Sequence, residues 1–361
     1  MSSVWGERLK ISLFGESRGE AVGVVIDGFP AGEPVDAEAL HAFLRRRAPG
    51  RDECSSARNE ADRPEILSGV VNGMSCGSPI CVLIRSHDAA SEAQDRERFV
   101  PRPGHADYPA FVKYGGAADL RGGGHFSGRL TAAICAAGGL CLPYLQRRGI
   151  QIAAHASSVA GIEDTPFDPL CSDAAVYRVL REQPYPVLSD EAKEKMLAAV
   201  RQAKADGDSF GGTVECLVTG LPVGLGGPLF GGLEPKLASI LFAIPAVKGL
   251  SFGDGFALAD LRGSEANDAY IRSGERIVTA SNHAGGIVGG MSNGMPLLLK
   301  AAFKPTPSIA RGQASVDLVR GEETMVRSGG RNDSCVVFRA VPVVEAAAAL
   351  AVCDLLQEGR L

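Results

Sequence analysis

The sequence lacks the features that mark secreted, membrane-spanning or nucleic-acid-binding proteins. It contains no uninterrupted apolar run of about 18 residues, which is the length that a membrane helix needs. Its N-terminus has no long apolar stretch, so we expect neither a signal peptide nor a membrane span. The net charge of −5 and the pI near 5.8 argue against a nucleic-acid partner.

Paired cysteines are also missing. The chain has nine cysteines, an odd number, and none of them forms a C-x-x-C pair. They lie among apolar or small neighbours, as Cys135 and Cys141 do, which is typical of buried reduced thiols rather than of disulfides or a zinc site. We therefore expect a cytoplasmic protein that binds no metal.

Two nucleotide-binding fingerprints are absent. Neither G-x-x-x-x-G-K-[ST] nor a strand-linked G-x-G-x-x-G occurs, so the sequence supports neither a Walker site nor a Rossmann site. What the chain does have is 361 residues, 45% of them hydrophobic, and 45 glycines. That is enough for a large core, in one big domain or two ordinary ones. We assign the glycines to tight turns and ligand loops.

The most informative stretch is residues 101–131, PRPGHADYPAFVKYGGAADLRGGGHFSGRLT. It combines His105 and His125 with arginines, aspartates and clustered glycines, and it leads into an apolar segment. Exposed glycine N–H groups and arginine forks both bind carboxylate or phosphate. The stretch therefore predicts an anion site at a helix N-terminus, the alternative being a solvated surface loop.

Local patterns predict the principal elements. Apolar runs and alternation indicate strands at 9–14, 22–26, 66–71, 80–84, 214–218 and 297–303. Helices are expected at 36–47 with Asp36 as N-cap, 127–145, 189–205 with Ser189 as N-cap, and 343–356.

Three short motifs occur twice in the same order. The pairs are IDGFPAG at 26–32 with VTGLPVG at 218–224, GVVNGMSCGSP at 69–79 with GIVGGMSNGMP at 286–296, and, more loosely, RPGHAD at 102–107 with RSGGRND at 327–333. Such echoes indicate a duplicated α/β unit. We expect a ligand site where its two halves meet.

Taken together, the motifs resemble those of chorismate synthases over nearly the whole chain. The matching runs are GES-x-G at 15–19, the arginines 45–47, EILSGVVNGMSCGSPI at 65–80, RPGHADYPAFVKYGG at 102–116, RGGG-x-x-S-x-R at 121–129, AVKGLSFGDGF at 246–256, LRGSEAND at 261–268, SNHAGGIVGGMSNG at 281–294, KPTPSI at 304–309 and GRNDSCVVFRAVPVVEA at 330–346.

The resemblance implies an α/β (α+β) fold, a pseudo-symmetric β-α-β-α sandwich built from a duplicated unit. Residues 1–361 would form a single domain, with halves at about 1–150 and 205–361 joined by a helical segment. Four copies would assemble into a homotetramer.

The implied reaction is a step of the shikimate pathway. A phosphorylated dicarboxylate, 5-enolpyruvylshikimate 3-phosphate, would lose phosphate and a proton by anti-1,4-elimination to give chorismate. Reduced FMN would be required without net redox change, and some family members use NADPH as the flavin reductant.

Site residues carry over by position in the motifs. His105 would set the protonation of the flavin, and Asp333 would assist proton removal near flavin N5. The substrate-binding residues would be Ser17, Arg47, Ser127, Arg129 and Arg331. The cofactor-binding residues would be Arg47, His125, Phe126, Ser127, Pro245, Ala246, Gly289, Lys304, Pro305, Thr306, Pro307, Ser308 and Arg331. Arg47 also occupies a position at which some members contact NADPH.

The chain departs from the family pattern in the same motifs. Arg18 replaces a histidine, His125 an arginine, Leu130 a glutamate and Asn332 a histidine, and Glu53 stands where a second arginine is expected. Arginine stabilises a departing phosphate but is a poor acid near neutral pH. We hypothesise an exchange in which Arg18 supplies fixed charge and His125 the proton. His125→Gln should then abolish turnover and leave FMN affinity mostly intact.

Two other functions stay open. The substitutions at Arg18, His125, Leu130 and Asn332 also fit a non-catalytic paralogue that binds a flavin or a phosphoanion. A flavin reductase that uses NADPH has less support, because no pyridine-nucleotide fingerprint is present.

Overall fold

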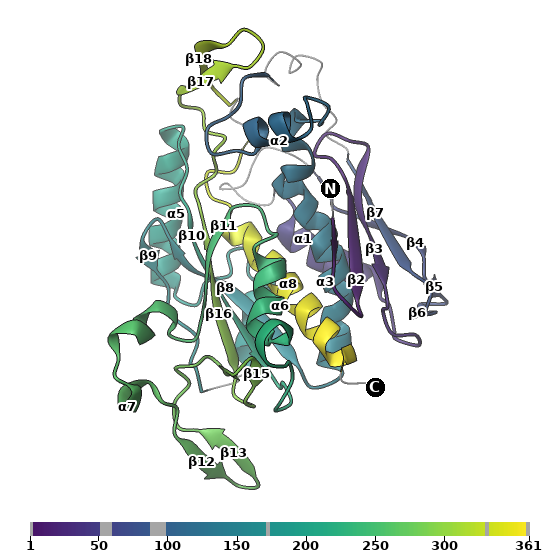
Figure 1. The fold of residues 1–361 in the computed structure, drawn as a ribbon, viewed down its shortest axis with the longest axis vertical. Coiled ribbons are helices and arrows are strands. Elements are labelled where there is room, and N and C mark those ends of the chain that lie inside the picture. The colour runs from purple at the N-terminus through teal and green to yellow at the C-terminus, as the bar shows by residue number, and fades with distance from the viewer. Residues whose placement is uncertain (1–2, 51–59, 87–98, 171–173, 329–331, 359–361) are drawn as a thin grey trace.

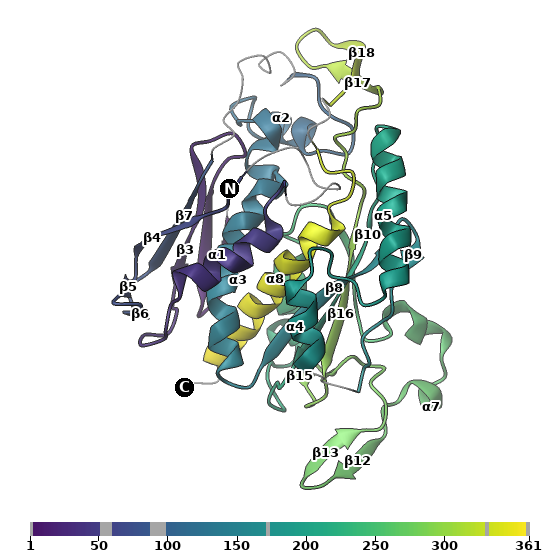
Figure 2. The same cartoon turned by 180° about the vertical axis from the view of Figure 1, so that it is seen from behind.

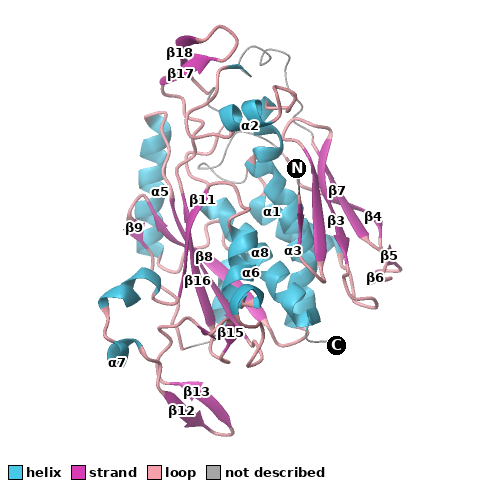
Figure 3. Ribbon diagram, viewed as in Figure 1, coloured by secondary structure: helices cyan, strands magenta, loops and turns pink. Residues whose placement is uncertain are grey.

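Two antiparallel sheets with helices between them form the framework of the protein (Figure 1). The structure is a computed structural model that describes residues 3–50, 60–86, 99–170, 174–328 and 332–358. Figure 3 separates the two sheets from the helical layer that they enclose. Further helices cover the outer face of one sheet (Figure 2), so the layers run sheet, helices, sheet, helices.

The first sheet has the strand order β1-β2-β3-β7-β4. Its strands are β1 (Val4–Trp5), β2 (Lys10–Gly15), β3 (Ala21–Asp27), β7 (Ile80–Arg85) and β4 (Pro64–Ser68). Each neighbouring pair is antiparallel. Along β3, Val22, Val24 and Ile26 alternate and are buried. This period of two turns their side chains to one face, against the central helices.

The second sheet has the strand order β11-β16-β10-β8-β9. Its strands are β11 (Val247–Phe252), β16 (Leu297–Phe303), β10 (Gly212–Thr219), β8 (Gln151–Val159) and β9 (Ile162–Glu163). The central strands β8, β10 and β16 are buried along most of their length, because helices pack on both faces. The helices on the outer face are α4 (Ala174–Glu182) and α5 (Asp190–Ala205).

The helices between the sheets are α1 (Ala37–Arg47), α3 (Thr131–Gln146), α6 (Leu233–Leu241) and α8 (Val337–Glu358). The predicted N-caps are confirmed. The Asp36 carboxylate accepts from the N–H groups of Glu38 and Ala39, and the Ser189 hydroxyl accepts from Ala192. The predicted start of the last helix at 343 is wrong. The helix begins at Val337 and continues through Pro342, its sixth residue, which leaves the carbonyl of Phe338 without the helical hydrogen bond that a non-proline residue would donate.

Helices α3 and α8 pack closely at the centre of the molecule. A Cβ atom on Gly138 would lie 2.4 Å from the Cα of Ala346, so only glycine allows this approach. In the part of the chain that the structure describes, these are the two helices long and apolar enough to cross a membrane by length and composition. They are 83% and 89% buried inside the fold over the apolar window and are its core helices.

The two sheets repeat one pattern, which bears out the predicted duplication of the fold. The order β2-β3-β7-β4 corresponds to β8-β10-β16-β11. In both halves a helix follows the second strand (α1 or α6), and a long helix follows the last strand (α3 or α8). The division of the chain near 150 and 205 stays a prediction.

The repeated motifs form the same local structure in each half. Ser75 N and Ser292 N donate to Glu33 O and Leu225 O, each at 2.9 Å. The Ser75 hydroxyl accepts from Glu33 N and donates to Pro30 O. In the same way, the Ser292 hydroxyl accepts from Leu225 N and donates to Pro222 O. The hairpins involved are β5 (Val70–Val71) with β6 (Met74–Ser75), and β14 (Ile287–Val288) with β15 (Met291–Ser292).

The remaining elements lie outside the layered core (Figure 1). They are α2 (Asp107–Lys113), α7 (Gly263–Ala266), the hairpin of β12 (Tyr270–Ser273) and β13 (Arg276–Thr279), and the hairpin of β17 (Gln313–Asp317) and β18 (Glu322–Val326). Short 3-10 turns at Arg121–Phe126 and Gly128–Leu130 lead into α3.

Candidate functional site

A cavity of about 730 Å³ lies where the two halves meet. It is bounded by the C-terminal end of α1, the first turns of α3 and α8, the loop before α2, and the ends of β11 and β16. Helix N-termini carry partial positive charge and unpaired N–H groups. Because the two longest core helices begin at this cavity, its location favours a negatively charged ligand.

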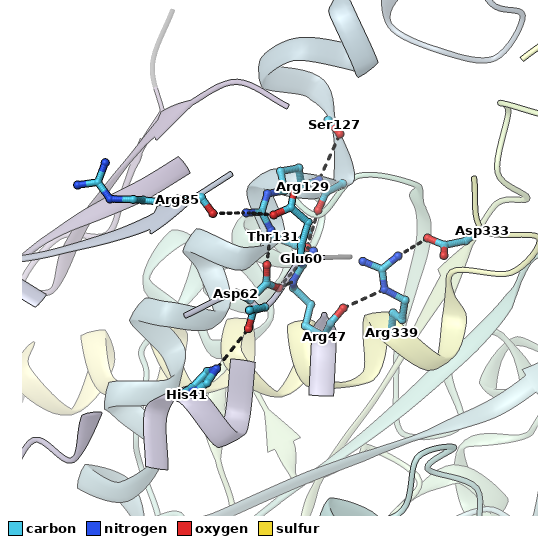
Figure 4. Close-up of polar contacts among 12 residues, drawn as sticks. His41, Arg47, Glu60, Asp62, Arg85, Ser127, Arg129, Thr131, Asp333 and Arg339 are labelled. Carbon is cyan, nitrogen blue, oxygen red and sulfur yellow. Dashed lines mark hydrogen bonds and ion pairs between the residues drawn. The ribbon is translucent and has the colours of Figure 1, made fainter. Parts of the chain in front are cut away.

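Two buried arginines share one carboxylate in the wall of the cavity (Figure 4). Asp62 accepts from Nε of Arg47 at 2.8 Å and also pairs with Arg129. Glu60 lies 3.7 Å from the Arg129 guanidinium. Burial opposes charge on Arg47 and Asp62. The attraction between them outweighs burial, however, so the pKa of Arg47 is raised and the pKa of Asp62 is lowered.

A second cluster joins the loop before α2 to the second half of the chain. Asp107 accepts from Nε of Arg102 at 2.8 Å, and one of its oxygens lies 2.7 Å from Nδ1 of His105. Burial would raise the pKa of Asp107, but hydrogen bonds from Arg102 and His105 hold it well below its usual range. The same arginine reaches Ser308 Oγ at 3.1 Å, and Lys304 Nζ donates to Gly104 O at 2.7 Å.

A third contact fixes Asp333 beside the first cluster. Arg339, in the first turn of α8, pairs with the Asp333 carboxylate and donates from Nε to Arg47 O at 2.9 Å (Figure 4). The side chain of Asp333 is therefore tied to the end of α1.

The glycine loop before α3 closes another side of the cavity. Gly122, Gly123 and Gly124 all have positive φ, a conformation that side chains rarely adopt. His125 follows them. Its Nδ1 lies 2.7 Å from Gly15 O and its Nε2 lies 2.7 Å from Ser3 Oγ. Both ring nitrogens of His125 are thus engaged within the protein.

The second half contributes an apolar wall and a cationic loop. The apolar wall residues are Phe126, Ile244, Pro245, Ala246, Val247 and Phe303, of which only Phe126 comes from the first half. Ala246 has φ of 77° and accepts from Lys304 N at 2.9 Å. Burial, and to a smaller extent Lys248, lower the pKa of Lys304. An apolar, partly aromatic wall beside cations suits a ring system that bears a phosphate.

Three buried polar atoms around the cavity have no hydrogen-bond partner among the described residues. They are Ser17 Oγ, Arg129 Nε and Thr306 Oγ1. Arg129 and Thr306 line the cavity, and Ser17 Oγ would lie 2.9 Å from a Cβ atom on Gly122, which also lines it. Buried polar groups are nearly always satisfied, so these atoms need water or a ligand.

Most of the residues predicted from the sequence line this cavity. They are Arg47, His105, His125, Phe126, Ser127, Arg129, Pro245, Ala246, Lys304, Thr306, Pro307, Ser308 and Asp333, together with the substituted Asn332.

Other predicted residues do not line it. Ser17 and Arg18 lie behind Gly122, Pro305 adjoins the cavity loop, and Leu130 is buried at the start of α3. Gly289 lies in the turn between β14 and β15, at the opposite end of β16. Arg331 and Glu53 lie outside the described residues.

Sequence reasoning missed the carboxylates and the arginine that hold the predicted cations in place. No sequence motif assigns a role to Asp62, Glu60 or Arg339. Asp62 is 15 and 67 positions from its two arginine partners, so no local pattern marks it. Arg102 and Asp107 lie in the stretch 101–131, but its pattern does not indicate a separate function for either of them. The cavity is therefore less positive than a count of its arginines suggests.

Comparison with known proteins points to one family. The family model for chorismate synthase matches residues 9–357. Chorismate synthase of Thermococcus gammatolerans is 47% identical over 352 residues, covering 97% of this chain and 96% of that protein. The Thermococcus kodakarensis protein of the same name is 46% identical, with 98% of each chain covered.

A solved crystal structure of a chorismate synthase matches the whole fold. It aligns with a TM-score of 0.78 at 27% identity, covering 98% of this chain and 93% of the other. This match confirms the predicted fold class. With the motif agreement, the family model and the close relatives, it shows that this chain belongs to the chorismate synthase family.

Proposed function

We propose that this protein is an active, FMN-dependent chorismate synthase. The reaction would be the anti-1,4-elimination of phosphate from 5-enolpyruvylshikimate 3-phosphate. The observation that carries the proposal is one cavity between the halves that gathers Arg47, His105, Arg129, Lys304 and Asp333. A dianionic phosphate and two carboxylates require such a set of cations and N–H donors.

The residues of the second half fit a flavin mononucleotide. Thr306 Oγ1 is buried without a partner among the described residues, and Lys304 and Ser308 lie in the same loop. These groups would hold the phosphate, and the wall at Phe126, Pro245 and Ala246 would hold the ring. When bound, reduced FMN supplies electron density to the allylic system as phosphate leaves. NADPH as its reductant stays a prediction.

The residues of the first half would hold the substrate anions. Arg129 Nε is the orphaned donor of the first cluster, because the rest of its guanidinium pairs with Asp62, Glu60 and the Arg85 carbonyl. Asp62 pairs with both arginines and fixes them in a buried wall. Donors that are already oriented stabilise developing charge without reorganisation.

Asp333 would assist the removal of the substrate proton. The electron pair of the broken C–H bond completes the new diene as the C–O bond to phosphate breaks. Arg339 holds the carboxylate of Asp333 toward the end of α1. Proton acceptors need such fixed geometry before their proton affinity matters.

The proposed exchange between Arg18 and His125 needs a movement of the ring. Because Nδ1 faces a carbonyl and Nε2 faces Ser3, His125 can give a proton to phosphate only after Nε2 leaves Ser3. His125→Gln should abolish turnover if the ring is the acid, whereas Ser3→Ala should not. Equal losses of activity in the two variants would indicate that His125 only holds the N-terminal segment in place through Ser3. The readout is phosphate release at saturating substrate.

One anaerobic assay tests the function as a whole. Purified protein, reduced FMN and 5-enolpyruvylshikimate 3-phosphate are mixed, and phosphate and chorismate are both quantified. Equal yields of the two products are expected. Equilibrium binding of FMN without turnover would favour the non-catalytic paralogue.

Two further expectations belong to this proposal. We expect a cytoplasmic homotetramer with a small-molecule substrate and with neither nucleic-acid nor membrane partners. Sedimentation velocity of the purified protein measures the assembly, and a monomer at micromolar concentration would contradict it.

A further inference from the structure

His105 lies between the side chains of Asp107, which can only accept a hydrogen bond, and Arg102, which can only donate one. Its Nδ1 lies 2.7 Å from a carboxylate oxygen of Asp107. One guanidinium nitrogen of Arg102 lies 3.2 Å from Nδ1 and 3.4 Å from Nε2. A group nearly equidistant from both nitrogens cannot lie along the in-plane direction of each. The Asp107 contact is shorter, and a carboxylate can only accept a hydrogen bond, so this contact decides the role of Nδ1.

Asp107 is itself held rigidly. It is buried and begins α2, and it accepts from the backbone N–H of Arg102 as well as from two nitrogens of its side chain. Arg102 is held in turn by Ser308 Oγ. The orientation of the His105 ring is thus fixed from both halves of the fold.

Apart from the Arg102 contact at 3.4 Å, the other ring nitrogen, Nε2, faces Gly123, which has no side chain. A Cβ atom on Gly123 would lie 2.9 Å from Nε2 of His105, and Gly123 has φ of 94°. The ring itself lines the cavity. Among the described residues, no carboxylate is paired with Nε2.

We propose that Asp107 is a positioning residue that keeps the neutral His105 ring protonated on Nδ1, so that Nε2 is the atom through which His105 exchanges a proton with a bound ligand. This inference rests on the proposed function. It adds the residue that selects the tautomer, as a carboxylate does for catalytic histidines in general.

The variant Asp107→Asn inverts this selection. Arginine has donors only, so the Asn amide oxygen turns to Arg102 and its NH₂ group turns to Nδ1. The ring must then accept at Nδ1 and carry its proton on Nε2. Size and shape are kept, and an acceptor for Arg102 remains.

The protein offers a matched control. His283 Nδ1 lies 2.6 Å from an oxygen of Asp254, a pair of the same chemistry that is partly exposed and does not line the cavity. Asp254→Asn should change the tautomer of His283 alone and leave turnover at the wild-type level.

The tautomer can be read without any ligand. Protein labelled with [¹⁵N]histidine is examined by magic-angle-spinning NMR above the pH at which the rings deprotonate, and the His105 signals are assigned as those lost in His105→Gln. Wild type should show protonated Nδ1 and bare Nε2, and Asp107→Asn should show the reverse. In the same variant kcat should fall about 10²-fold or more, with KM changed by less than about threefold.

The outcomes separate the two proposals. Wild-type His105 with its proton on Nε2 would overturn the role of Asp107, as would an inverted tautomer with unchanged kcat. Wild-type protein without turnover rejects the proposed function, and the NMR comparison still decides what Asp107 does. If Asp107→Asn does not fold, the wild-type spectrum alone tests the assignment.

Discussion

Two of the histidines that contact carboxylates, His105 at the cavity and His155 in the core, differ in what their second ring nitrogen contacts. His155, on β8, lies 2.7 Å from Asp164 and 3.0 Å from Glu215, one carboxylate at each ring nitrogen. His105 has a carboxylate at Nδ1 only. An imidazole ring with a carboxylate at each nitrogen is held as a cation. A ring with a carboxylate at one nitrogen only can exchange a proton through the other.

The surroundings of the core cluster fit a structural role. Its two carboxylates also accept backbone N–H groups from Phe167, Leu188 and Ser189, which anchors the segment around α4 and α5 to the second sheet. Around the cavity, by contrast, polar atoms of Ser17, Arg129 and Thr306 are left without partners among the described residues. Charge clusters alone do not mark a site. Unsatisfied buried donors beside a cavity do.

Breaking the core cluster should have the largest effect on stability. His155→Leu leaves two buried carboxylates without their cation and should cost about 3–5 kcal/mol of unfolding free energy. Urea denaturation followed by circular dichroism measures this loss. The folded fraction should keep the wild-type kcat. A variant with normal stability and no turnover would reverse the roles assigned to the two histidines.

Breaking the cavity cluster of Arg47, Asp62 and Arg129 should reduce catalysis more than stability. Arg129→Met removes the orphaned donor while Asp62 keeps Arg47, so kcat/KM should fall about 10²–10³-fold. The urea midpoint should move less than in His155→Leu. Arg85→Met, which removes an arginine from an exposed pair with Glu65, is the control and should change neither quantity appreciably. Equal catalytic loss in both variants would contradict the site.

The pH dependence of stability should separate the clusters further. Burial would lower the pKa of His155, but Asp164 and Glu215 raise it. Its stabilisation is therefore complete below the unfolded value, about 6.5, and is lost as pH rises through the raised value.

The carboxylates behave in the opposite sense. The pKa values of Asp62, Asp107, Asp164 and Glu215 are lowered, so their stabilisation is present above about pH 4 and is lost as pH falls further. Urea midpoints measured across a range of pH for wild type and His155→Leu test both the loss of stability at high pH and the loss at low pH. The difference in urea midpoint between wild type and His155→Leu should become smaller as pH rises through the raised pKa of His155. A difference that does not change with pH would contradict the charged state of His155.

The smallest effect is expected at Thr306. Thr306→Val removes a buried hydroxyl that lacks a partner among the described residues, so the stability of the ligand-free protein should be unchanged or slightly higher. FMN affinity should fall about five- to tenfold, because about 1 kcal/mol of hydrogen bonding is lost. Fluorescence titration with FMN measures it, and Thr306→Ser is the control that keeps the hydroxyl. Unchanged affinity in Thr306→Val would remove this residue from the flavin site.

Much of the fold could be predicted because its signals are local. Asp36 and Ser189 mark helix starts through their own side chains, and the repeated motifs at 26–32 and 218–224 indicate the duplication directly. The start of α8 was harder. The amphipathic pattern over 343–356 locates this helix but not its start, because the helix begins at Val337 and continues through Pro342.

The candidate site could be predicted only in part. His105, Arg129 and Lys304 belong to motifs with recognisable spacing, and they do line one cavity. The partner of a residue, however, is a property of the folded chain. Asp62 joins Arg47 to Arg129 across 15 and 67 positions, and Arg102 reaches Ser308 across 206.

The sequence by itself determined the family, the duplicated α/β unit and the cations of the site, because these depend on local composition and on motif order. Only the tertiary structure decided which cations are neutralised, which donors stay unsatisfied and which histidine nitrogen remains available. Those properties depend on burial and on distances between segments far apart in the chain, and a local sequence pattern does not predict them.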